Sequence, residues 1–324
     1  STTAAGAYWR VLLFSDRIRV EDQSMGSRGG RTWMILVASS LALAGCGAEE
    51  ETAVADAVPG DIAALGTLLV ATNPTFPPAE FRTPVEFRDV ERGEVTGFEV
   101  ELMEAVAEEL GLEVEWLDVA FPEVIESVAA EEADVGAAAI TVTDDRLAEA
   151  SFVTFFSTGT QWVVREPNAA GVTPNGACGA RVAVQTGTVQ ADDLATRSAA
   201  CGETDEDPID IVEFDGQDEV TAAVLSGVAS AFVADAPAAA WAVRQSGGTP
   251  NAASTVNTGR LATVGQQYDV APYGWAVADV ELGEALLAGL GAVVDSGEYQ
   301  EILEFWNVEE GAVPADQIEL VSGG

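Results

Sequence analysis

An arginine beside a helix-start sequence is the first residue whose type and position suit ligand binding. Arg146 follows Thr143-Asp144-Asp145, and threonine and aspartate are favoured N-cap residues. The guanidinium is therefore expected near the first turn of a helix. Its planar fork of donors matches a carboxylate through two parallel charge-assisted hydrogen bonds. The alternative is a surface arginine paired with one of the many acids.

A second anion site is predicted where Gly187-Thr188 opens a helix over residues 189–197. Backbone N–H groups at a helix start point outward, together with the positive end of the helix dipole. A plain strand–turn–helix corner is the alternative interpretation.

Asp235 is the candidate for binding a positive group. It ends the buried apolar run 231–234 and precedes Pro237. A carboxylate in such a place is costly unless it is paired. It could also serve as N-cap for a helix over 238–245, and the two roles are compatible.

The elements that must position these residues alternate between strand and helix. Leu102, Met103, Val106 and Leu110 lie at helical spacing and predict a helix over 98–110. Alternation with acids predicts a half-exposed strand over 112–116. Further strands are expected at 68–72, 135–140, 181–185, 209–214 and 231–234, extended segments at 161–166 and after 259–265, and helices around 122–132, 218–225, 282–296 and 299–306. Interleaved strands and helices favour mainly parallel sheets, which bind ligands at the carboxyl ends of their strands.

The charge balance excludes several classes of partner. Of 324 residues, 54 are acidic and 14 basic, all arginine, and histidine is absent, so the net charge is −40. Such a field repels nucleic acid and anionic lipid. It suits high ionic strength, where salt screens self-repulsion; a specific cationic partner is the alternative. Without histidine, hydrolytic or metal-dependent chemistry is disfavoured, and we expect no cofactor and no metal.

The first 46 residues predict export. Met25 is followed by Arg28 and Arg31, an apolar stretch, and Leu43-Ala44-Gly45-Cys46. This segment resembles the lipobox of bacterial lipoproteins, in which the cysteine is lipidated, and it is too short to span a bilayer. We therefore expect an upstream mis-start over 1–24, a signal peptide over 25–45, lipidation at Cys46 and an acidic tether over 46–62. The remaining cysteines, Cys178 and Cys201, are expected to form a disulfide outside the cytosol, and two free buried thiols are the alternative.

Five motifs occur in the order typical of one family. They are Thr75-Phe76-Pro77-Pro78, Gly97-Phe98-Glu99-Val100-Glu101-Leu102, Ile140-Thr141-Val142-Thr143 with Arg146, Val184-Gln185-Thr186-Gly187-Thr188, and Ala234-Asp235. Over about residues 66–313 the chain resembles the amino-acid ABC-transporter substrate-binding proteins, also called extracellular solute-binding proteins family 3. The resemblance implies an α/β, two-lobed fold of the type II periplasmic binding protein class with two hinge crossings. Lobe 1 is expected to comprise 63–162 plus 268–324, and lobe 2 to comprise 163–267.

The resemblance also implies which residues hold a ligand. The ligand carboxylate is assigned to Arg146, Thr141, Thr188 and the amide of Val189, and the α-ammonium to Asp235 and the carbonyl of Ala139. The residues expected along the ligand side chain are Phe76, Phe98, Asn73 and Gln185, and a place in the hydrophobic core is the alternative for the two phenylalanines. Many relatives carry aspartate where Asn73 stands, so one obvious partner for a cationic ligand is replaced by a neutral amide.

The implied activity is binding rather than catalysis. Closure of the lobes would capture a free, polar amino acid and present it to an ABC permease in the membrane, with the protein acting as a monomer. One rival is an enzyme on the same fold, such as the cyclohexadienyl dehydratases, which need a carboxylic acid poised in the cleft. The other is a ligand-sensing accessory lipoprotein.

Overall fold

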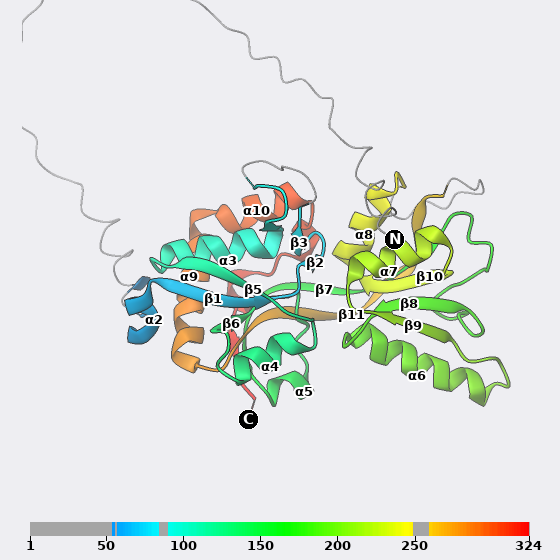
Figure 1. Ribbon diagram of the computed structural model, residues 1–324, viewed down its shortest axis with the longest axis horizontal. Helices are drawn as coiled ribbons and strands as arrows, with labels where there is room; N and C mark the ends of the chain where they lie inside the picture. The colour runs from blue at the N-terminus through cyan, green and yellow to red at the C-terminus, as the bar shows by residue number, and fades with distance from the viewer. Residues whose placement is uncertain (1–53, 56, 84–89, 249–258, 324) are drawn as a thin grey trace, which may run out of the picture. The chain divides into compact units, whose positions relative to one another are not determined.

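The computed structural model describes residues 54–55, 57–83, 90–248 and 259–323. The predicted signal peptide and Cys46 lie outside these residues. Within them, a large mixed sheet runs in the order β5 (Glu113–Asp118), β1 (Thr67–Thr72), β6 (Val135–Gly136), β11 (Leu261–Val277), β7 (Ser151–Arg165), β10 (Ala231–Asp235), β8 (Arg181–Gln185) and β9 (Asp210–Phe214), and β12 (Leu320–Val321) pairs with β7. Helices cover the sheet (Figure 1). This arrangement confirms the predicted α/β class.

The first lobe holds most of the N-terminal elements and the C-terminal helices. Its elements are α2 (Gly60–Leu65), β1 (Thr67–Thr72), β2 (Thr75–Phe76), β3 (Glu80–Arg82), β4 (Val95–Thr96), α3 (Phe98–Glu109), β5 (Glu113–Asp118), α4 (Glu123–Ala129), β6 (Val135–Gly136), α5 (Asp144–Leu147), α9 (Val280–Ser296), α10 (Glu298–Trp306), β12 (Leu320–Val321) and the short 3-10 turns η2 (Glu309–Gly311) and η3 (Ala315–Gln317). Strand β1 pairs in parallel with both β5 and β6. Their carboxyl ends therefore meet at one edge.

The apolar stripe predicted for α3 packs into the core of this lobe. Leu102, Met103 and Val106 are fully buried. Helices α3 and α9 lie against each other, and a Cβ added at Gly289 of α9 would stand 3.0 Å from Cγ1 of Val106. The small residue thus permits the close helix contact that buries this stripe.

The second lobe repeats the arrangement with fewer elements. They are β8 (Arg181–Gln185), α6 (Val189–Glu203), β9 (Asp210–Phe214), α7 (Gln217–Ser226), β10 (Ala231–Asp235) and α8 (Ala236–Gln245). Strand β8 pairs in parallel with β9 and with β10. The residues Gln185 and Asp235 therefore end neighbouring parallel strands at the same edge.

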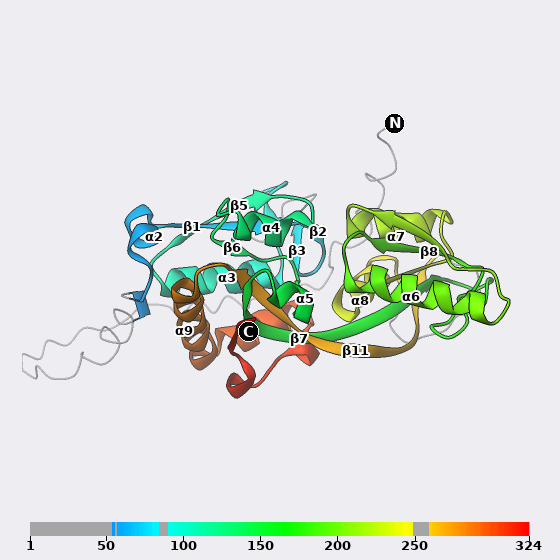
Figure 2. The same cartoon turned by 90° about the horizontal axis from the view of Figure 1, so that it is seen from below.

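Two long antiparallel strands run from one lobe into the other. They are β7 (Ser151–Arg165) and β11 (Leu261–Val277), which lie side by side (Figure 2). Both are much longer than the extended segments expected from the sequence, because each continues through the core of both lobes. They match the two predicted crossings; the exact lobe boundaries of residues 63–162 plus 268–324 and 163–267 stay a prediction.

Two local differences from the sequence expectation have physical reasons. Strand β6 covers only Val135–Gly136 of the expected 135–140, because the chain turns at Ala139 with a left-handed φ of 49°. The expected tether extends to residue 62, yet Val58 and Ile62 pack into the core of the first lobe. The folded part thus begins before residue 63.

The second lobe carries the predicted disulfide between Cys178 and Cys201. The two residues are 23 apart in sequence and join the start of β8 to α6. In the chain-entropy account, closing a loop of this size stabilises the fold by about 3 kcal/mol.

In the part of the chain that the structure describes, no helix is long and apolar enough to span a membrane.

Candidate functional site

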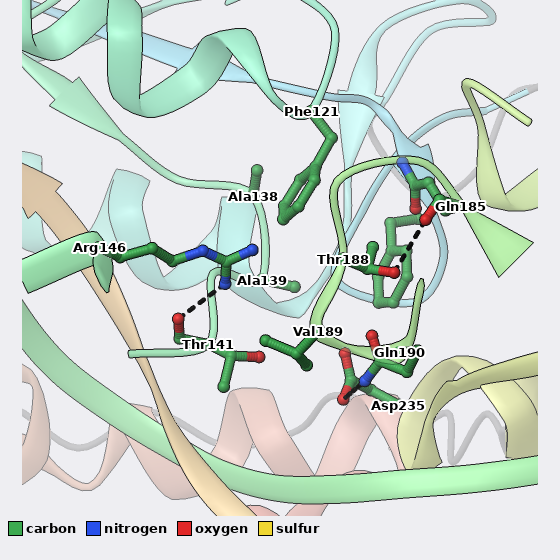
Figure 3. A pocket seen from close by; sticks show the side chains of 11 residues that line it. Phe121, Ala138, Ala139, Thr141, Arg146, Gln185, Thr188, Val189, Gln190 and Asp235 are labelled. Carbon is green, nitrogen blue, oxygen red and sulfur yellow. Dashed lines mark hydrogen bonds between the residues drawn. The ribbon is translucent and has the colours of Figure 1, made fainter. Parts of the chain in front are cut away.

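A narrow pocket lies where the carboxyl ends of the parallel strands of both lobes face each other (Figure 3). Its lining residues are Phe76, Phe121, Ala138, Ala139, Thr141, Arg146, Gln185, Thr188, Val189, Gln190 and Asp235. The first six come from the first lobe and the other five from the second. This edge is where open α/β sheets bind ligands.

Arg146 is held at the start of α5 as predicted. The Thr143 hydroxyl caps this helix by accepting a hydrogen bond from the Arg146 amide at 3.3 Å. The guanidinium donates from Nη1 to the Thr141 carbonyl at 2.7 Å, and from Nη2 to the Gly187 carbonyl at 3.1 Å. The Phe121 ring centroid lies 5.3 Å from its Cζ. Burial lowers the Arg146 pKa, while Asp235 and Asp192 raise it.

Thr188 opens α6 opposite Arg146. Its hydroxyl donates to the Gln185 carbonyl at 2.8 Å and accepts from the Ala191 amide at 3.2 Å, so it is the N-cap of the helix. Gly187 before it has a φ of 75°, and a Cβ there would stand 2.8 Å from Pro122. Only glycine fits this close turn without strain. The turn directs the first amides of α6 toward the pocket.

Asp235 lies at the end of β10 and is only 6% exposed. Although it occupies the N-cap position of α8, its side chain makes no capping hydrogen bond. Instead Oδ1 accepts from Gln190 Nε2 at 2.9 Å. Burial raises its pKa to about 6, and Tyr273, Gln190 and Arg146 oppose that rise. The carboxyl group is thus directed to the pocket and away from the helix end.

Gln185 joins the two lobes beside the pocket. Its Nε2 donates to Asn73 Oδ1 at 3.0 Å and to the Asp215 carbonyl at 3.1 Å. Among the residues that the structure describes, nothing donates to its buried Oε1. A side chain that lines the pocket therefore carries a buried acceptor without a donor.

The structure brings eight of the ten sequence-predicted ligand residues to the pocket and places two elsewhere. Phe98 is completely buried because the first turn of α3 packs inward. The centroid of its ring lies 5.0 Å from the centroid of the Phe156 ring. Asn73 does not line the pocket, since its amide donates to the Val119 carbonyl and its Oδ1 accepts from Thr75 and Gln185.

Three lining residues were not expected from the sequence: Phe121, Ala138 and Gln190. Phe121 follows the carboxyl end of β5, so its place after a parallel strand could have indicated it. Ala138 is next to the expected Ala139. Gln190 lies in the first turn of α6, where it holds Asp235. In the described residues, no group of acids and cysteines is arranged to hold a metal ion.

The fold and the site together define a two-lobed solute-binding protein of the type II periplasmic class. A sequence profile for the bacterial extracellular solute-binding proteins, family 3, matches residues 68–309. The chain belongs to this family, whose members are extracytoplasmic.

Individual relatives agree with this assignment. The arginine-binding protein ArgT of Corynebacterium glutamicum is 33% identical over 293 residues, covering 85% of this chain and 90% of the relative. An ancestral arginine-binding protein solved with arginine is 28% identical with a TM-score of 0.64, covering 74% of this chain and 98% of its own. An ancestral amino acid-binding protein, described as a precursor of cyclohexadienyl dehydratase, is 25% identical with a TM-score of 0.61, covering 76% and 97%. These relatives are binding proteins, which favours binding over catalysis.

Proposed function

We propose that this protein captures a free α-amino acid between its lobes and delivers it to the permease of an ABC importer. The observation that carries this proposal is the placement of one arginine and one aspartate, from opposite lobes, on the same pocket. A free amino acid carries a carboxylate and an ammonium on one carbon. Arg146 would bind the first and Asp235 the second.

Other pocket groups complete the arrangement. Thr141, Thr188 and the amide of Val189 would hold the carboxylate, and the Ala139 carbonyl would accept from the ammonium. Because these groups come from both lobes, the bound ligand would stabilise the closed state. The Arg146 bond to Gly187 would yield to the stronger, charge-assisted bond with the ligand.

The side chain of the ligand is proposed to be polar, and arginine is the first candidate. Two relatives are arginine-binding proteins. In this chain, Gln185 Oε1 offers an acceptor, and the rings of Phe76 and Phe121 line the same pocket. A guanidinium can donate to such an acceptor and stack on such rings.

Calorimetry against the common amino acids tests the proposal. We expect one polar amino acid, with arginine foremost, to bind with one ligand per chain, and light scattering to report a monomer. Binding of no amino acid, or turnover of prephenate or arogenate by the purified protein, would contradict it.

We further propose that the chain is anchored by lipid at Cys46 after removal of residues 25–45. The support is the run Leu43-Ala44-Gly45-Cys46 after an apolar stretch, in a family that acts outside the cytoplasm. In bacteria grown with labelled palmitate, the protein should incorporate label and partition with membranes, and Cys46→Ala should abolish both. Cys178→Ser serves as control. Equal labelling of the Cys46→Ala protein would disprove the anchor.

A further inference from the structure

Two buried glutamates lie behind the turn that forms the first-lobe side of the pocket. Glu80 on β3 is 1% exposed, and Glu99 in the first turn of α3 is completely buried. Neither residue lines the pocket.

The backbone forces the two carboxyl groups together. The Phe98 amide donates to the Pro78 carbonyl at 2.9 Å, and the Glu99 amide donates to the Ala79 carbonyl at 3.2 Å. Gly97 has a φ of 145°, and a Cβ there would overlap the Ala79 carbonyl. This close approach of the two segments leaves the carboxyl groups of Glu80 and Glu99 within hydrogen-bonding reach of each other.

The hydrogen bonds around the pair do not suit two carboxylates. Glu99 Oε2 accepts from the Ala139 amide at 2.7 Å. The Trp275 indole of β11 also faces Glu99. Apart from these groups and the pair itself, no described residue supplies a donor to the other three oxygens.

The neighbouring charged groups do not offset the negative charge that two carboxylates would carry. The other titratable groups that face it are the Asp235 carboxyl from the end of β10 and the Tyr273 hydroxyl from β11. No described arginine is among the groups that shift the pKa of either glutamate. Two adjacent carboxylates in a dry site, without a cation, repel each other strongly.

We propose that Glu80 and Glu99 share one proton, and that this acid–carboxylate pair holds the Ala139 turn in its ligand-binding position. Glu80 carries the proton and donates to Glu99, while the Glu99 carboxylate accepts from the Ala139 amide. Both glutamates are positioning residues, since they act on the ligand through Ala139.

The direction of the pKa shifts agrees with this assignment. Burial and the neighbouring Glu99 raise the pKa of Glu80 well above its usual range. Burial raises the pKa of Glu99 to about 7, against the lowering effect of Glu80, the Ala139 amide and Trp275.

The pair lies next to a pocket residue whose backbone conformation needs support. Ala139 adopts a left-handed φ of 49°, which a non-glycine residue adopts only when its surroundings hold it there. The Glu99 bond supplies that restraint. This consequence rests on the proposed function, because it concerns the carbonyl assigned to the ligand ammonium.

The proton is tested without any ligand. In Glu80→Gln the side-chain amide can donate to Glu99 permanently and has no proton to lose. A raised pKa in the fold means that stability falls as pH rises, because the unfolded chain ionises first. We therefore expect the melting temperature of the wild type to fall more steeply between about pH 5 and pH 8 than that of Glu80→Gln. The infrared absorption of a protonated carboxyl group at neutral pH should be weaker in the variant by one group.

Glu104→Gln is the matched control. Glu104 lies five residues after Glu99 in α3, its pKa is also raised by burial, and its carboxylate accepts from the Trp116 indole away from the pocket. This variant should keep the strong infrared band of the pair. An identical pH slope in wild type and Glu80→Gln, or an unchanged infrared band, would overturn the shared proton, whether or not an amino acid binds.

The positioning role is tested by calorimetry with arginine. Glu80→Gln and Glu99→Gln both keep an acceptor for the Ala139 amide and should bind within about threefold of the wild type. Glu99→Leu removes the acceptor and should weaken binding at least about tenfold, while the unfolding transition stays cooperative. If Glu99→Leu does not fold, Glu80→Gln is compared with Glu80→Leu, which has no donor for Glu99. Equal losses of binding in these two variants would overturn the proposal, because a hydrogen-bond donor at position 80 would then not be enough to keep Ala139 in place. Failure of the wild type to bind any amino acid would instead reject the proposed function and leave the infrared result standing.

Discussion

Replacing Arg146 with alanine should weaken amino-acid binding about a thousandfold, on the order of 4 kcal/mol. The guanidinium is partly buried, and its two Nη atoms donate to the Thr141 and Gly187 carbonyls. Its removal would leave a ligand carboxylate in a pocket with no other arginine among its lining residues. Calorimetry with the best ligand measures this effect.

Two variants make the result specific. Arg146→Lys keeps the charge but loses the planar fork, so we expect a smaller loss, on the order of tenfold to a hundredfold. Arg181→Ala removes an arginine that is half exposed and paired with Asp210 on the surface, and it should bind normally. If Arg146→Ala bound as tightly as Arg181→Ala, the carboxylate assignment would be wrong.

Replacing Asp235 with asparagine should weaken binding on the order of a hundredfold at neutral pH. The ligand ammonium needs the ionised carboxylate, and burial raises the pKa of that group to about 6 in the ligand-free protein. Wild-type affinity should therefore fall up to about tenfold per pH unit as the pH drops below about 6. Asp235→Asn should lose this dependence, as a calorimetric pH series would reveal.

The same variant should gain stability while it loses function. Because the folded pKa is raised, the acid form is favoured in the fold, and stability is lost as the pH rises from about 4 to about 6. Asparagine does not ionise, so ligand-free Asp235→Asn should melt at or above the wild-type temperature at neutral pH. Asp210→Asn, on the surface, is the control. A melting temperature of Asp235→Asn below that of the wild type would mean that the Asp235 carboxyl group stabilises the fold.

Features of the site that follow from local chain geometry could be predicted from the sequence. The positions of Arg146 and Thr188 depend on the N-caps of α5 and α6, and N-cap residues can be recognised from the local sequence. Asp235 ends a short apolar run, and such a run predicts a buried strand whose carboxyl end faces the ligand edge. The order of strands and helices was predictable because each element leaves a local pattern of apolar residues in the sequence.

Features that depend on contacts between distant segments could not be predicted. Phe98 starts an amphipathic helix, and nothing in the local pattern tells whether its ring faces Phe156 or the pocket. Asn73 pairs with Gln185, which lies 112 residues away in the other lobe. The partnership of Glu80 and Glu99 arises in the same way, since it requires the close approach at Gly97.

The paired crossing strands also determine where this molecule can bend. The register of the ladder between β7 and β11 shifts three times: between Val264 and Tyr268, between Tyr268 and Ala271, and between Tyr273 and Gly274. At the first two shifts, Gly159 of β7 lies so close to the Tyr268 carbonyl that a Cβ would overlap it. We therefore expect the torsion of an opening movement to be absorbed over residues 264–274 of β11, where the register shifts, while the regular ladders at 261–264 and 274–277 keep their pairing.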